Sequence, residues 1–424
     1  MRLTLPDKPV KLYEDTLEKL EYFKDRKDVG DKLSKFLEAI EEPLVIALDG
    51  SWGCGKTHFL KLWVGSHTES TDAATTVIYF DAFENDYLDD PLISLIDAIT
   101  DRLKQTGKLE QISKTLKKLA PNLARISLRS LVSVASASIV NNADEMMAPG
   151  SHSDIWQSVE ERRAAMVQFS CALRNVASPT SEGGEPGRLV LVIDELDRCR
   201  PDYALSLLET IKHVFWVDKV HIVLGVNLSE LENTVRARYG MAVDATRYLH
   251  KFYQAKIPIN GDCTYHNVGD ELKNYFQYLQ TIQDLELGLL ERPILELAQI
   301  AFRSNNLSLR DLQRISTRAA IVENVHGNPG PIPNITAILI FLDTLRPELL
   351  TKILNLRKHD NDLALEIGKV LALRSRGSTP STPSDFINAV NFICLLKNET
   401  LDRIYQDVSV SELVEQYIWD IKLM

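Results

Sequence analysis

The sequence predicts an α/β fold with a mainly parallel five-stranded sheet, followed by an all-α C-terminal half. Runs rich in Val, Ile and Leu lack polar alternation, which is typical of strands buried on both faces of a sheet. Helical stretches separate these runs, as parallel connections require. The strand runs cover residues 44–49, 75–83, 188–194, 219–227 and 253–259. After residue 259 apolar residues recur at helical spacing, for example in 285–302 and 308–324.

Composition limits the classes of function. The chain has 424 residues, with 48 Lys and Arg against 59 Asp and Glu, and its net charge is −11. This balance excludes nucleic-acid binding driven by overall positive charge, although it leaves room for a local basic patch. The cysteines have no paired spacing, so the sequence predicts neither a disulfide framework nor a cysteine zinc site. They are Cys54, Cys171, Cys199, Cys263 and Cys394.

The sequence also shows no sign of export or membrane insertion. Its first residues lack the apolar core of a secretory signal. The longest apolar stretch outside the expected strands, residues 128–140, is too short to span a bilayer. We therefore expect a cytoplasmic protein without integral membrane attachment.

A phosphate-binding loop directly follows the first strand run. GSWGCGKT, at 50–57, fits the pattern G-x-x-x-x-G-K-[ST] in full, and a helical stretch comes after it. Backbone N–H groups of such a loop and the following helix N-terminus bind phosphate. Lys56 is expected to reach the β- and γ-phosphates and the Thr57 hydroxyl to bind Mg²⁺. The predicted nucleotide-binding residues are Gly50, Ser51, Trp52, Gly53, Cys54, Gly55, Lys56, Thr57 and His58.

Two carboxylates end the third strand run. Asp194 is expected in the magnesium shell, because an acid at the tip of a neighbouring strand holds this shell in phosphate-loop enzymes. Glu195 follows it and is placed to polarise a water for attack on the γ-phosphate, which predicts hydrolysis. The same acids also suit the start of the helix that follows, which is the alternative for Glu195.

These residues resemble the KAP family of P-loop NTPases. The loop at 50–61, GSWGCGKTHFLK, looks like the family's G-x-W-G-x-G-K-T loop. VIDELDRCRPDYALSLLETIKHVF, at 192–215, is similar to its extended D-[DE]-L-D-R-C motif and the helix after it. Segments 79–99 and 221–259 resemble further strands and helices of the family. The match covers roughly Gly50 to Pro258.

The resemblance implies an ATPase of the additional-strand group, with ATP and Mg²⁺ as cofactors. In this group another strand separates the phosphate-loop strand from the strand bearing the metal-binding acid. Asn227 ends that intervening strand, where relatives commonly place a γ-phosphate sensor. Many relatives carry transmembrane helices between the two phosphate-site motifs, and this sequence has no spanning segment there.

Several arginines are candidates for contacting the transferred phosphoryl group. In oligomeric ATPases an arginine of the next subunit often does so. Arg236, Arg238 and Arg247 lie between the fourth and fifth strand runs, a suitable place for such a finger. Arg310 and Arg314 are candidates for a contact from the helical half. For each of them, an ordinary charge on a helix surface is the favoured alternative.

The chain is expected to comprise four parts. About 100 residues separate the second and third strand runs, far more than one crossover needs. We expect the first part of the P-loop NTPase domain in 1–100, a helical insert in 101–187, the second part of that domain in 188–260 and an α-helical C-terminal domain in 261–424. The insert is lysine-rich near its start, which is typical of a solvated helix face.

The function predicted from these features is a Mg²⁺-dependent ATPase that works as a nucleotide-driven switch or assembly ATPase. The family resemblance implies a role in antiviral (phage) defence, with effector proteins as partners, and a homo-oligomer. One alternative is a scaffold that binds ATP without hydrolysing it. The other is a nucleic-acid motor or loader, which the net charge does not favour.

Overall fold

The computed structural model describes residues 10–20, 25–71, 75–88, 90–105, 114–119, 151–177, 187–259, 268–304, 306–326, 333–354, 361–371 and 390. The apolar stretch 128–140, Cys263 and Cys394 lie outside these residues. Among the described helices, none combines the length and the hydropathy needed to cross a bilayer.

All strands predicted from the sequence are present, and they form one parallel sheet in the order β2-β3-β4-β1-β5. The intervening strand β4 separates β1, which precedes the phosphate loop, from β3, which ends at Asp194. This arrangement confirms the predicted fold of the additional-strand type. The strands are β1 (Leu44–Asp49), β2 (Thr75–Asp81), β3 (Arg188–Asp194), β4 (Val220–Val226) and β5 (Ala255–Pro258).

Helices cover both faces of the sheet, as the unbroken apolar strands require. Side chains alternate along β1, so that Val45 and Ala47 join one core while Ile46 and Leu48 join the other. One face carries η1 (Leu17–Lys19), α1 (Asp25–Ala39) and α2 (Lys56–Ser70). The opposite face carries α3 (Pro91–Gln105), α6 (Ser151–Val176), α7 (Pro201–Val214), α8 (Leu228–Tyr239) and α9 (Ala245–Leu249).

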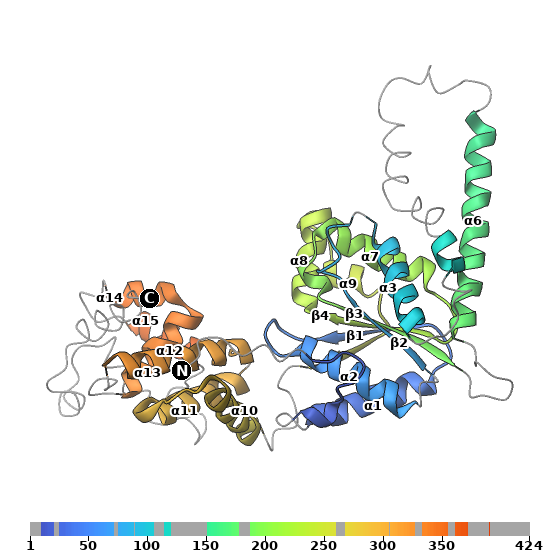
Figure 1. Cartoon of the computed structure of the whole chain (residues 1–424). Helices are drawn as coiled ribbons and strands as arrows, with labels where there is room; N and C mark the ends of the chain where they lie inside the picture. The colour runs from blue at the N-terminus through green and yellow to red at the C-terminus, as the bar shows by residue number, and fades with distance from the viewer. Residues whose placement is uncertain are drawn as a thin grey trace, which may run out of the picture.

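The C-terminal half is helical and has a hydrophobic core of its own. It lies beside the sheet domain, as Figure 1 shows. The predicted helix 308–324 corresponds to α12, and the predicted helix 285–302 is divided between η3 and α11. The elements are α10 (Val268–Gln283), η3 (Gly288–Leu290), α11 (Glu291–Arg303), α12 (Leu309–His326), α13 (Pro333–Leu345), α14 (Pro347–Leu354) and α15 (Asn361–Val370).

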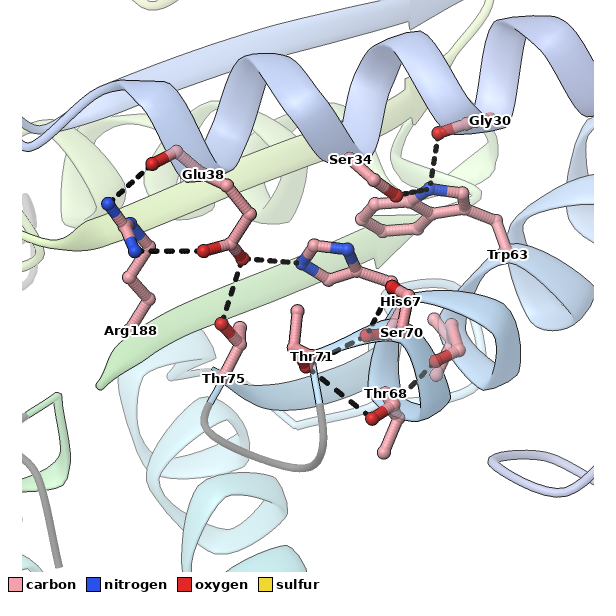
Figure 2. A network of polar contacts seen from close by, with 11 residues as sticks. Gly30, Ser34, Glu38, Trp63, His67, Thr68, Ser70, Thr71, Thr75 and Arg188 are labelled. Carbon is pink, nitrogen blue, oxygen red and sulfur yellow. Dashed lines mark hydrogen bonds and ion pairs between the residues drawn. The ribbon is translucent and has the colours of Figure 1, made fainter. Parts of the chain in front are cut away.

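A polar network joins α1 and α2 to the amino ends of β2 and β3 (Figure 2). Glu38 accepts from Arg188 Nη1 at 2.8 Å and from Thr75 Oγ1 at 2.9 Å. Its Oε1 also lies 3.4 Å from Nε2 of His67, whose ring stacks on Trp63. These contacts fix the amino ends of β2 and β3, whereas ligand sites of parallel sheets lie at the opposite, carboxyl ends of the strands.

Candidate functional site

The phosphate loop joins the carboxyl end of β1 to the start of α2. Gly53 (φ 81°) and Gly55 (φ 88°) adopt the left-handed backbone that only glycine enters at low cost. These two turns bring Lys56 back over the loop, and its Nζ donates to the carbonyl of Gly50 at 2.6 Å. Lys56 is only 8% exposed, so its charge is concentrated inside the loop.

Asp194 is fully buried at the end of β3. Its Oδ1 accepts from the backbone N–H of Glu195 at 2.9 Å, and its Oδ2 accepts from the hydroxyl of Tyr79 at 3.0 Å. Gly225 of β4 stands opposite Asp194, and its missing side chain leaves room for this carboxylate. Burial raises the pKa of Asp194, while the hydrogen bond from Thr57 lowers it. A cation beside this carboxylate would offset the cost of burying its charge.

Glu195 lies where β3 passes into the short turn η2 (Leu196–Arg198). Its backbone is left-handed at φ 58°, an uncommon conformation for a residue with a side chain. Its Oε1 accepts from Thr57 Oγ1 at 3.3 Å and pairs with Arg198 Nη1 at 2.9 Å. Burial raises the pKa of Glu195, and the charge of Arg198 opposes this shift. The structure thus brings Thr57, Asp194 and Glu195 together, as the sequence predicts.

A cavity of about 600 Å³ opens over these residues. This volume lies within the range of small-ligand sites. The walls come from the phosphate loop, from the ends of α1 and β3, and from α10 and α12 of the helical half. The predicted residues of the phosphate loop and of the end of β3 that line it are Ser51, Trp52, Gly53, Gly55, Lys56, Thr57, His58, Asp194 and Glu195.

The start of α12 packs directly on the phosphate loop. A Cβ placed on Gly53 would lie 2.8 Å from Ser308 Oγ and 2.9 Å from Arg310 Cβ. Ser308 caps α12, because its Oγ accepts from the backbone N–H of Asp311 while the Asp311 carboxylate accepts from Ser308. The cap fixes this end of the helix, and the exposed side chain of Arg310 lines the cavity. Arg314 is not among the lining residues.

The cavity wall also carries side chains that the sequence analysis missed. Arg26 of α1 is 4% exposed and donates from Nη2 to the carbonyl of Cys54 at 2.7 Å. Tyr275 and Tyr278 of α10 face the same space, with ring centroids 6.2 Å apart and planes 27° from parallel. No local signal marks these residues, because segments far apart in the chain bring them together.

The remaining predicted residues do not line this cavity. Gly50 contributes its carbonyl to Lys56, and Cys54 turns its side chain into the core beneath the loop. Asn227 occupies the N-cap position of α8 at the end of β4, between β1 and β3, and its side chain makes no capping hydrogen bond. The arginine candidates lie on α8 and α9: Arg236 pairs with Glu232, Arg238 pairs with Asp202, and Arg247 is exposed near the start of α9.

The donor set at the bottom of the cavity suits a hard cation. The Thr57 hydroxyl and the Asp194 carboxylate are oxygen ligands of the kind that Mg²⁺ prefers. The described residues contain no group of three or more His, Cys, Asp or Glu that could hold a metal alone.

Comparison with known proteins yields one family. The model of the KAP family P-loop domain matches residues 26–325. No curated protein matches the chain. Two solved structures of the Aeropyrum pernix ORC2 protein are similar, one of its ADPNP–ADP complexes and one of its ADP form. They share 13% and 12% identity with this chain, with TM-scores of 0.38 and 0.37. Each alignment covers 95% of this chain, and 96% and 95% of those chains respectively.

Proposed function

The chain belongs to the KAP family of P-loop NTPases, and on that premise we propose that it is a Mg²⁺-dependent ATPase. Nucleotide binding follows from the family. Hydrolysis goes beyond binding, and one observation supports it. The Glu195 carboxylate lies beside Thr57 and Asp194 in the wall of the cavity that the phosphate loop forms. A site for binding alone needs no such acid.

The proposed reaction is transfer of the γ-phosphoryl group to water. A water oxygen attacks the γ-phosphorus, and the bond from that phosphorus to the β–γ bridging oxygen breaks, giving ADP and inorganic phosphate. Glu195 accepts the proton that the water loses and passes it to solvent. Lys56 and the N–H groups of the loop stabilise the charge on the phosphate oxygens. Asn227 is proposed as the γ-phosphate sensor.

Mg²⁺ would be held by Thr57 and Asp194 together with phosphate oxygens. It would supply a positive charge that neutralises the β- and γ-phosphates. The void left by Gly225 and the hydrogen bond from Tyr79 hold the Asp194 carboxylate in place for this task. Both residues thus support the metal ligands without contacting the nucleotide.

The helical half is proposed to sense the nucleotide. Ser308 and Arg310 pack against Gly53 of the phosphate loop, and Arg310 lines the cavity. A triphosphate attracts this arginine more strongly than a diphosphate does, because its terminal group carries more charge. Hydrolysis would therefore weaken the contact and change the position of the helical half. Tyr275 and Tyr278, which also line the cavity, would face the nucleobase.

A homo-oligomer is proposed to complete the site. Arg236 and Arg238 are each paired within the chain, whereas Arg247 is exposed and has no ion-pair partner among the described residues. Because these arginines do not line this chain's own cavity, a role in catalysis would require contact with a neighbouring subunit's nucleotide. Of the three, Arg247 is the best candidate for that contact.

In biological terms, we propose a cytoplasmic ATPase of phage defence that acts on separate effector proteins. Family membership supports this, since relatives include phage-exclusion proteins. We propose that residues 1–100 and 188–260 form the P-loop NTPase domain, that 101–187 form its helical insert and that 261–424 form the C-terminal domain. Phage titres measured with and without the gene and its neighbours test the role, and unchanged titres across a broad panel would contradict it.

Release of inorganic phosphate from ATP tests the enzymatic proposal. The wild-type chain is expected to hydrolyse ATP only with Mg²⁺. Lys56→Ala is expected to lose nucleotide binding, whereas Glu195→Gln should bind ATP normally but hydrolyse it at least about 100-fold more slowly. Undiminished hydrolysis in the double variant would refute the proposal. ATP binding without any hydrolysis by the wild type would instead favour the scaffold.

A further inference from the structure

The turn η2 after Glu195 is fixed to two parts of the site. Asp197 in this turn accepts from the indole N–H of Trp52 on the phosphate loop. Arg198 ends the turn, and its backbone N–H donates to the carbonyl of Glu195 at 3.1 Å. The backbone of η2, including that of Arg198, is therefore held by contacts to the phosphate loop and to the end of β3.

Arg198 and Thr57 hold the same oxygen of Glu195. Arg198 Nη1 lies 2.9 Å from Oε1, and Thr57 Oγ1 donates to Oε1 at 3.3 Å. Among the described residues, no hydrogen bond or ion pair is made by Oε2. The carboxylate is thus anchored through one oxygen, while its other oxygen is available to a water in the cavity.

The contact with Arg198 matters because the backbone of Glu195 does not by itself fix the position of the carboxylate. Its left-handed conformation places the residue at a sharp turn between β3 and η2. A glutamate side chain has several rotatable bonds, so without Arg198 its carboxylate would sample positions away from the cavity. The ion pair with Arg198 removes part of this freedom.

We propose that Arg198 is a positioning residue for ATP hydrolysis, which holds Oε1 of Glu195 so that Oε2 accepts the proton of the attacking water. The inference rests on the proposed hydrolysis and adds to it a residue that acts through Glu195. In the proposed reaction Lys56 and Arg310, and not Arg198, supply positive charge to the phosphates.

Arg198→Ala and Arg198→Lys test this role, with Arg200→Ala as the matched control. Arg200 lies two positions further on, pairs with Asp86 and is absent from the cavity wall. Arg198→Ala is expected to lower kcat about 100-fold, the cost of a misplaced reacting group, and to leave the dissociation constant for MgATP unchanged. Arg198→Lys should recover part of kcat. Arg200→Ala should match the wild type in both quantities.

A double-variant cycle with Glu195→Gln separates positioning from direct phosphate contact. If Arg198 acts through Glu195, then adding Arg198→Ala to Glu195→Gln lowers the residual rate no further. An additional loss in that background, or a weakened affinity for MgATP in the single variant, would mean that Arg198 contacts the phosphates and would overturn the inference. An unchanged kcat in Arg198→Ala would mean that the ion pair between Arg198 and Glu195 has no role in hydrolysis, as for many surface ion pairs, and would also overturn the inference.

Thermal unfolding of each variant checks that it folds. If Arg198→Ala does not fold, Arg198→Gln and Arg198→Lys serve the same comparison, because both keep a long polar side chain. A wild-type chain that binds ATP but never hydrolyses it would refute the proposed ATPase itself. An active wild type with an equally active Arg198→Ala would refute only the role of Arg198.

Discussion

Oδ1 of Asp194 occupies the space that a side chain on Gly225 would need. The two residues pair across the parallel strands β3 and β4, where Gly225 stands directly opposite Asp194. A glycine within a buried strand costs stability. Here it makes room for a buried carboxylate at the bottom of the cavity, so the choice of residue in β4 decides where the carboxylate of β3 can lie.

Gly225→Ala is therefore expected to disable hydrolysis. The added methyl group would push the Asp194 carboxylate and the side chain of Leu60 out of place. We expect kcat to fall at least about tenfold and the free energy of unfolding to drop by about 1–3 kcal/mol, as for other overpacked sites. Phosphate release at several Mg²⁺ concentrations and urea unfolding measure the two effects.

Gly240→Ala is the control for this substitution. Gly240 has a left-handed backbone at φ 95°, but nothing lies within 4 Å of a Cβ placed there. This variant should lose stability through backbone strain and keep the wild-type hydrolysis rate. A fully active Gly225→Ala would show that Asp194 does not need its present position.

The sheet and the phosphate site were predictable because their signals are local. A buried strand, a glycine loop and a helix start occupy consecutive residues from Leu44 onward. The acids Asp194 and Glu195 also follow their strand directly, and parallel strands bring such ends to one edge. The expected strands at 75–83, 219–227 and 253–259 extend slightly beyond β2, β4 and β5, since strand ends carry the weakest pattern.

The arginine and tyrosine side chains of the cavity wall that come from α1 and α10 were not predictable, because no local signal in the sequence marks them. Arg26 and Tyr278 are more than half of the chain apart, and each resembles an ordinary residue of an amphipathic helix. Only the packing of α10 and α12 against the phosphate loop places them together. Likewise, nothing local indicates that Arg198 would pair with Glu195 rather than contact the nucleotide.

Tyr278→Ala is expected to weaken ATP binding without affecting binding of inorganic tripolyphosphate. Stacking of a base on an aromatic ring contributes about 1–3 kcal/mol, so the dissociation constant for ATP should rise by about 5- to 150-fold. Tripolyphosphate has no base, so it can contact only the part of the site that binds phosphates. Isothermal titration calorimetry with both ligands measures the difference.

Tyr239→Ala provides the comparison for Tyr278. Tyr239 is 44% exposed, lies beside Tyr248 and is not part of the cavity wall. Its removal should leave both ligands unaffected. Equal weakening of ATP and tripolyphosphate by Tyr278→Ala would indicate a general loss of the site rather than loss of a base contact.

Arg310→Ala is expected to reduce the preference for ATP over ADP. A hydrogen bond to a charged group contributes about 1.5–3 kcal/mol, so ATP affinity should fall by about tenfold or more while ADP affinity is unchanged. Arg314→Ala is the control, because Arg314 follows one turn later on α12 and does not line the cavity. Dissociation constants for both nucleotides decide the matter, and a parallel loss for ATP and ADP would exclude a γ-phosphate contact.

The amino ends of the strands predict how stability depends on pH. His67 and His221 are fully buried, and burial lowers the pKa of each to about 4. The charge of Arg188 on β3 also lowers both values. Glu38 of α1 is close to His67, but its charge is already engaged by Arg188 and Thr75. The folded protein therefore holds both imidazoles neutral.

An unfolded histidine has a pKa near 6.5, so between about pH 6.5 and pH 4 the unfolded chain binds protons that the folded chain does not. The two neutral imidazoles therefore make their full contribution to the free energy of unfolding above about pH 6.5. This contribution falls as the pH drops toward 4, by up to about 3 kcal/mol for each imidazole. Urea unfolding at pH 7.5, 6, 5 and 4 measures the slope. His67→Phe keeps a ring against Trp63 and should make the slope shallower, whereas His213→Phe, at the end of α7, should leave the contribution of the two buried rings intact. An equally steep slope in His67→Phe would mean that the carboxylates alone set the acid sensitivity of this fold.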